Sequence, residues 1–142
     1  MRQLNEASGP QAAGAVQRLL EHWRSRGGEL QYGTSASASC APIIKVGGQS
    51  LYAIRFYAKS AEIPFGLLRK RKPFDDPALR EELRQRLNDA PGVDIPVAKL
   101  ELYPPIKNTQ LANVAVSDVV VAALDWFMAV VTASDERAWD SP

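Results

Sequence analysis

The sequence predicts an α+β fold with an N-terminal helix, an antiparallel sheet of three to five strands, and two further helices packed on one face of the sheet. Three observations support this prediction. A helical repeat of apolar residues comes first, short apolar segments separated by tight turns fill residues 29–68, and two more helical patterns follow. The short connections favour antiparallel strands, because parallel strands need crossovers of about a dozen residues or more.

The length of 142 residues and the apolar content of 46% suit one domain with its own core. We expect its globular part to span about residues 9–131. The segment 132–142 is polar and is predicted to form a loose tail, in which Trp139 is too isolated to belong to the core.

The first helix is predicted over residues 11–26. Ser8 or Gly9 can cap it, Pro10 suits its first turn, and Gly27 and Gly28 end it. Its buried stripe consists of apolar residues three and four positions apart, namely Ala12, Val16, Leu19, Leu20 and Trp23.

Extended segments follow at residues 29–33, 41–46, 51–58 and 62–68, with a loop of small residues at 34–39. Gly47 and Gly48 supply a hairpin turn, because glycine adopts positive φ at both central positions. These segments predict a meander of antiparallel strands.

The alternation in segment 51–58 predicts which side chains share a face of the sheet. One face would carry Tyr52, Ile54 and Phe56, and the other Arg55 and Tyr57. The strands are only partly polar, so we expect a partner or a second copy to cover the face of the sheet away from the helices.

The second helix has clear start and stop signals. Asp76 is a natural N-cap, Pro77 fits the first helical position, and residues 88–92 end the helix. Its apolar stripe is Leu79, Leu83 and Leu87. Prolines break residues 93–106 into short extended pieces or a single helical turn.

A final helix is predicted from Ser117 or Asp118 to about Val131. Its apolar residues cover nearly all sides, so we expect it to be largely buried, with Trp126 in the core.

Charge and composition exclude several classes of protein. The formal net charge is +1, so no global field draws the chain to nucleic acid or to a membrane. One cysteine, Cys40, excludes an internal disulfide and a multi-cysteine zinc site. The first residues lack the apolar core of a signal peptide, and the apolar run 119–131 falls short of the ~20 residues needed to span a bilayer. We expect a cytoplasmic protein without a membrane partner.

The sharpest electrostatic feature is the run Arg69, Lys70, Arg71 and Lys72. Four consecutive cations can contact a phosphate backbone and release its counterions. The alternative is a solvated turn whose charge is balanced by the nearby acids Asp75, Asp76, Glu81 and Glu82. Both interpretations stay open, and the second is the simpler.

The acidic residues suggest a metal-dependent nuclease as an alternative, but the spacing does not match one. Such an enzyme places an acid and a Glu-x-Lys on neighbouring strands around Mg²⁺. Lys99 and Glu101 stand in the reverse order, and Glu62 is followed by Ile63 and Pro64. Asp75 and Asp76 are better explained as a helix cap.

The other chemically active residues have structural explanations. His22 is expected on the surface of the first helix, where a cation near the C-terminal end is favourable. Cys40 is expected to be a half-buried small apolar residue. Ser35, Ser37 and Ser39 have no nucleophile motif around them, and Gly47-Gly48 is a turn and no phosphate loop. We therefore assign no catalytic residue, cofactor or metal.

Aromatic residues on the strands offer one further hypothesis, a stacking platform for single-stranded nucleic acid. The candidates are Tyr32, Tyr52, Phe56 and Tyr57. No RNP motif surrounds them, and aromatic residues in strands are usually core.

Taken together, the caps, turns and core positions resemble a recurrent bacterial α+β domain found in uncharacterised proteins. The resemblance covers about residues 16–131 and rests on residues at 23, 33, 42, 62–63, 65, 68, 73–75, 79–80, 83, 87–88, 91–93, 95–96, 105 and 124–126. It implies an accessory or binding module and brings no catalytic residues.

The function we expect is a non-enzymatic binding or accessory module that acts through its sheet face and its basic turn. Its partner would be a protein, either another chain or a second copy, with weak nucleic-acid binding as a further expectation. The alternative is a metal-dependent phosphodiesterase or nuclease.

Overall fold

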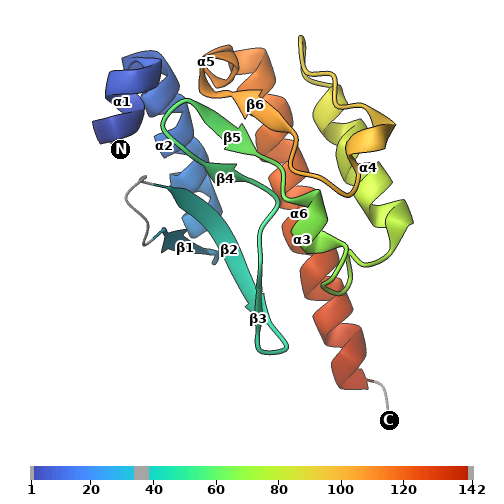
Figure 1. Cartoon of the computed structure of the whole chain (residues 1–142). Coiled ribbons are helices and arrows are strands. Elements are labelled where there is room, and N and C mark those ends of the chain that lie inside the picture. Colours follow the sequence, from blue (N-terminus) through green and yellow to red (C-terminus); the bar gives the residue numbers. More distant parts are fainter. Residues whose placement is uncertain (1, 34–38, 141–142) are drawn as a thin grey trace.

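The computed structural model describes residues 2–33 and 39–140, with side chains for residues 4–33 and 39–135. It confirms the α+β fold with an antiparallel sheet (Figure 1). Helices α2 (Pro10–Ser25) and α6 (Val114–Asp140) contact each other and strand β2 (Cys40–Val46). The predicted loop at 34–39 lies outside the described residues except for Ser39.

The described part of the sheet has six strands, one more than the upper limit predicted. Strands β1 (Glu29–Tyr32), β2, β4 (Arg55–Phe56), β5 (Ser60–Glu62) and β6 (Pro105–Lys107) lie side by side in that order. Strand β3 (Gln49–Leu51) forms a hairpin with the other end of β2. Strand β6 comes from the proline-rich segment, where Ile106 pairs with Ala61 of β5.

The predicted strand 51–58 is split, because β2 pairs with two different strands. Ile44 of β2 faces Leu51 of β3, whereas Cys40 faces Phe56 of β4. On β2, three residues (41–43) lie between the two paired positions. On the segment that runs from β3 to β4, four residues (52–55) lie between the corresponding positions. One additional residue bulges the chain there and reverses the alternation of its side chains.

This bulge corrects the predicted faces of the sheet. Tyr52 is half-buried and its ring lies 4.9 Å from the Arg55 guanidinium. Ile54 and Phe56, predicted to share a face with Tyr52, are instead buried in the core, at 1% and 2% exposure. Residues Tyr52 and Arg55 therefore lie together on the outer side.

The predicted strand 62–68 is wrong beyond Glu62. After Pro64 the chain forms the short helix α3 (Phe65–Leu68), whose last turn is closed by Leu68 N donating to Pro64 O at 2.9 Å. Proline has no N–H for a strand ladder, and its fixed φ suits a helix start.

The remaining helices are α1 (Arg2–Ser8), α4 (Pro77–Asn88), the 3₁₀ turn η1 (Val97–Lys99) and α5 (Asn108–Leu111). Helix α1 was not predicted. The N-cap of α4 is confirmed, since Asp76 Oδ1 accepts a hydrogen bond from Ala78 N at 2.9 Å.

Helix α6 is longer than predicted at both ends. It begins at Val114, where Asn113 Oδ1 accepts from Ala115 N at 3.0 Å, so Asn113 replaces Ser117 and Asp118 as the capping side chain. It also continues to Asp140. The loose tail predicted from residue 132 is therefore wrong through residue 140, the last residue described.

The four largest of the fully buried side chains are aromatic, and they anchor the core. Trp23 of α2 donates its indole N–H to Ile43 O at 2.9 Å, and Phe74 stacks on Phe127 with ring centroids 4.7 Å apart. Phe65 is fully buried beside them in the same cluster. Trp126, predicted to be core, is only half-buried, with its ring against Phe74 on one side and under the Arg86 guanidinium on another.

Helix α6 is also less buried than predicted. Its residues Val114–Asp135 form a 22-residue stretch whose most apolar 18 residues have a mean hydropathy of 2.0, and 33% of those 18 residues are buried. This stretch is long and apolar enough to span a membrane. The core helix of a soluble protein can meet the same criterion of length and composition. The expectation that the apolar segment is too short to cross a bilayer is thereby corrected.

Candidate functional site

The outer side of the sheet carries a cluster of polar side chains around Arg55. Its guanidinium donates to Gln31 Oε1 at 3.0 Å and to Ser39 Oγ at 3.0 Å. Glu62 is the cross-strand neighbour of Arg55 in the register of β4 and β5. Directly paired residues in an antiparallel ladder share a face, so an acid and a base meet there.

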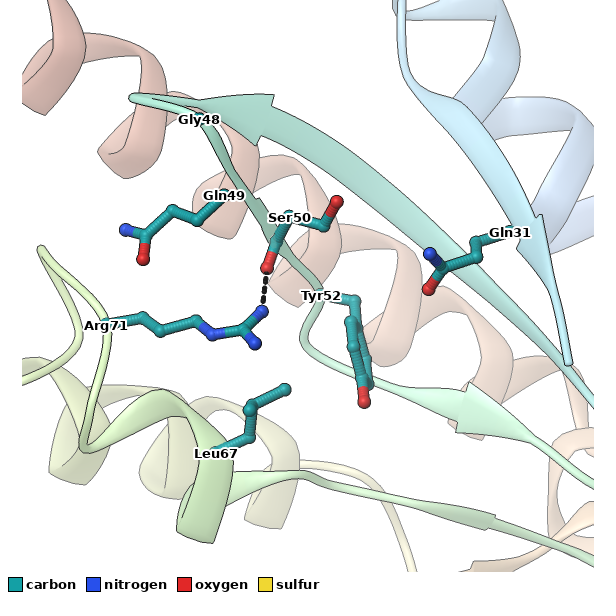
Figure 2. Close-up of a pocket in the computed structure, with 7 residues that line it drawn as sticks. All are labelled: Gln31, Gly48, Gln49, Ser50, Tyr52, Leu67 and Arg71. Carbon is teal, nitrogen blue, oxygen red and sulfur yellow. Dashed lines mark hydrogen bonds between the residues drawn. The ribbon is translucent and has the colours of Figure 1, made fainter.

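A pocket of about 480 Å³ opens beside this cluster, between the β2–β3 hairpin and the turn that follows α3 (Figure 2). It is lined by Gln31, Gly48, Gln49, Ser50, Tyr52, Leu67 and Arg71. In Figure 2 Arg71 and Leu67 approach it from the turn side, while Gln31 and Tyr52 approach it from the strands. The structure thus brings one residue of the predicted basic run into a pocket.

Arg71 has a structural role that the other three cations of the run lack. It is half-buried and its guanidinium donates a hydrogen bond to Ser50 O in the hairpin. A second, longer contact runs the other way, with Gln49 Nε2 donating to Lys72 O at 3.4 Å. The hairpin and the turn therefore hold each other in place.

Arg69, Lys70 and Lys72 are exposed, and the structure shows no ion pair for them among the side chains that it describes. Two of the four acids that were expected to balance their charge, Glu81 and Glu82, form ion pairs within α4. Glu81 contacts Arg84, and Glu82 Oε2 lies 2.7 Å from Arg86 Nε. Hydrogen bonds from Arg84 are the main reason that the pKa of Glu81 lies below its ordinary value.

Several hydrogen-bonding groups in the pocket have no protein partner among the described residues. They are the Tyr52 hydroxyl, the Ser50 hydroxyl, the Gln31 amide N–H₂ and the Gln49 amide oxygen. Groups of this kind can donate to or accept from a bound ligand. The lining contains one cation and no carboxylate.

The predicted stacking platform does not form as a set. Phe56 is in the core. Tyr32 is 66% exposed, but it pairs with Cys40, which in turn pairs with Phe56, so Tyr32 lies on the inner side at the edge of the sheet. Tyr57 is half-buried, and burial followed by the charge of Glu62 raises its pKa. Tyr52 is the member of the set that lines the pocket.

The lone histidine has a partner that the sequence did not indicate. His22 Nε2 lies 2.8 Å from Asp125 Oδ1, and Arg26 Nε lies 3.8 Å from the same oxygen. This contact links α2 to α6 across 103 residues of sequence. It explains the one acid within the apolar run and differs from the free surface position predicted for His22.

Cys40 is more buried than predicted, at 6% exposure. Burial raises the pKa of its thiol, a shift that outweighs the opposing charge of Arg55. Among the described residues, no three His, Cys, Asp or Glu side chains gather in a group that would hold a metal ion.

In comparisons with known proteins, the chain matches no family model, no curated protein and no solved structure at a significant level.

Proposed function

We propose that this protein is a non-enzymatic binding module whose basic turn and outer sheet side bind a polyanion through its phosphate groups. The observation that carries the proposal is the placement of Arg69, Lys70 and Lys72. They are exposed, unpaired among the described side chains, and next to a polar pocket that contains no acid.

The physical basis is counterion release. Each phosphate that a cation neutralises frees condensed counterions, which contributes affinity without sequence preference. The turn is also preorganised, because Arg71 and Gln49 bind it to the hairpin. A ligand therefore does not bear the full entropy of ordering the turn.

The test is binding of fluorescent oligonucleotides by anisotropy at about 20 mM salt, where screening is weak. With about three contacts, the slope of log K against log salt should be near −2 for a single strand and near −3 for a duplex. The triple variant Arg69→Ser, Lys70→Ser, Lys72→Ser keeps Arg71 and should lose most of this binding.

A matched control removes three exposed cations on other parts of the fold, two on α2 and one between β4 and β5, in the variant Arg18→Ser, Arg24→Ser, Lys59→Ser. It changes the net charge by the same amount. The proposal holds if the control binds like the wild type. Equal losses in the two variants would show that overall charge and not the turn drives binding, and an absence of wild-type binding would end the proposal.

A second candidate function, self-association, is supported by the outer face of α6. Ala115, Ala122 and Ala129 are exposed and seven residues apart, which places them along one line of the helix. Val114 beside them is 65% exposed. A line of small side chains of this kind allows a second copy of the helix to approach closely.

Sedimentation equilibrium at several concentrations tests self-association. The wild type should show a dimer that the variant Ala122→Glu loses, because a charge cannot be buried unpaired in a helix interface. Glutamate is nearly as good a helix former as alanine, so the fold should persist. A wild type that stays monomeric throughout would refute this candidate.

The nuclease alternative has no structural observation of its own. Lys99 and Glu101 are exposed in and after η1, and Asp76 is used as the cap of α4.

A further inference from the structure

We propose that the pocket binds an unpaired base of a single-stranded nucleic acid while the neighbouring turn holds its phosphates. This inference rests on the proposed function and adds the class of polyanion. Arg71 belongs to both the pocket and the basic turn, since it lines the pocket and lies between the exposed cations Lys70 and Lys72. A phosphate on the turn thus places the base of the same nucleotide within reach of the pocket.

The lining has the chemistry that a base requires. The Tyr52 ring and the Leu67 side chain offer apolar surfaces for the π-face of a base, and Figure 2 shows both beside the Arg71 guanidinium. Stacking of bases on aromatic rings tolerates every sequence, because each base has a π-face. Arg55 lies against Tyr52 at 4.9 Å and fixes the position of its ring.

The free polar groups match the edge of a base better than they match a second phosphate. Among the described residues, the Gln31 amide oxygen accepts from Arg55 and its N–H₂ group has no partner, while the Gln49 amide nitrogen donates to Lys72 O and its oxygen has none. The pocket therefore offers one neutral amide donor and one neutral amide acceptor, the groups that read base edges. A polyphosphate has acceptors only, so it could pair with the amide donor but would leave the amide acceptor without a partner.

A duplex is a poorer match for the same surface. Its bases are stacked inside the helix, so a duplex contacts the turn through its backbone and leaves the pocket empty. Single strands present splayed bases that enter concave sites. The volume of about 480 Å³ suits one base with accompanying water.

The experiment compares four probes at about 20 mM salt: a single-stranded oligothymidine, an abasic strand of the same length, a duplex and polyglutamate. The wild type should bind the strand with bases about tenfold more tightly than the abasic strand, which is within the range for one stacked base. The variant Tyr52→Leu should bind both strands equally, with the affinity that the wild type has for the abasic strand.

Tyr32→Leu is the matched control, because Tyr32 is exposed on the other side of the sheet and should keep the tenfold difference. The side-chain amide signals of Gln31 and Gln49 provide a second readout by NMR that does not depend on the Tyr52 variant. They should shift with oligothymidine and stay in place with the abasic strand.

The outcomes separate the two proposals. Equal binding of strands with and without bases, or polyglutamate that competes as well as oligothymidine, would overturn the base pocket and leave the anion-binding turn intact. Failure of every probe to bind would overturn the proposed function itself. Tighter binding of the duplex than of the single strand would also overturn the base pocket.

Discussion

Phenylalanine and tyrosine differ in burial, because only tyrosine carries a hydroxyl group. All four phenylalanines are at most 2% exposed, whereas Tyr32 and Tyr103 are more than half exposed and Tyr52 and Tyr57 are intermediate. A buried hydroxyl without a partner costs free energy, so tyrosine favours the boundary with water. Tyr52 follows this rule, since it is half-buried and lines the pocket.

At the N-cap of α4, Asp76→Ala should lower the free energy of unfolding by about 0.5–2 kcal/mol, because Ala78 N would lose its acceptor. Asp75→Ala is the control, since Asp75 is exposed and does not cap the helix. Urea denaturation measures both. Equal effects of the two substitutions would contradict the capping role, and saturable Mg²⁺ binding that depends on both acids would revive the nuclease alternative.

The Cys40 thiol should react slowly with a thiol reagent in the folded protein and quickly in urea. Burial raises its pKa, so the folded chain keeps the thiol proton to higher pH than the unfolded chain does. Its contribution to stability is therefore complete below the unfolded pKa and is lost as pH rises through the folded value. The stability difference between wild type and Cys40→Ala should shrink as pH rises above the ordinary thiol pKa of about 8.5. A constant difference would contradict this assignment.

At the scale of elements, α6 owes its place to Phe127 and not to Trp126. Phe127→Ala should cost about 3–5 kcal/mol, the range for truncating a buried aromatic residue. Trp126→Ala should cost clearly less, because its side chain is half exposed and contacts Arg86 at the surface. Urea denaturation measures the loss in unfolding free energy for each variant. A larger loss for Trp126→Ala would contradict the assignment of the Phe127 face of α6 to the core.

The junction between α2 and β1 depends on a close approach at Gly28. A Cβ there would lie 2.1 Å from Trp23 Nε1, the atom that donates to Ile43 O. Gly28→Ala should therefore destabilise the fold by about 1–3 kcal/mol, the usual range for overpacking. Thermal melts followed by circular dichroism measure the loss.

Gly14→Ala, inside α2, is the comparison for Gly28→Ala. Its Cβ would meet only the flexible end of Arg18 at 3.4 Å, and alanine is the better helix former. This variant should gain about 0.5–1 kcal/mol. If both substitutions acted in the same direction, the packing of Trp23 against Gly28 would be wrong.

At the scale of the whole molecule, one apolar cluster includes residues from Leu4 in α1 to Val131 in α6. We therefore predict that the chain is a single domain that unfolds in one cooperative step. Far-ultraviolet circular dichroism and tryptophan fluorescence should give the same urea midpoint. Separate midpoints would show that part of the chain folds independently.

The sequence by itself determined those features whose signals lie within a few neighbouring residues. Asp76 and Pro77 start α4, and Gly27 ends α2 with a φ of 92°. Gly47 and Gly48 form the hairpin turn with φ of 56° and 78°. Each signal acts through a local hydrogen bond or a local backbone preference, so no distant contact was needed to predict it.

Only the tertiary structure decided where the strands pair and where the candidate site lies. The split of β2 between β3 and β4 comes from contacts between distant segments, and it moves Tyr52 to the side of Arg55. The pocket exists because Arg71 binds Ser50, 21 residues away in sequence. Pairing of this kind depends on which surfaces can be buried together, a property of the whole chain that no short segment carries.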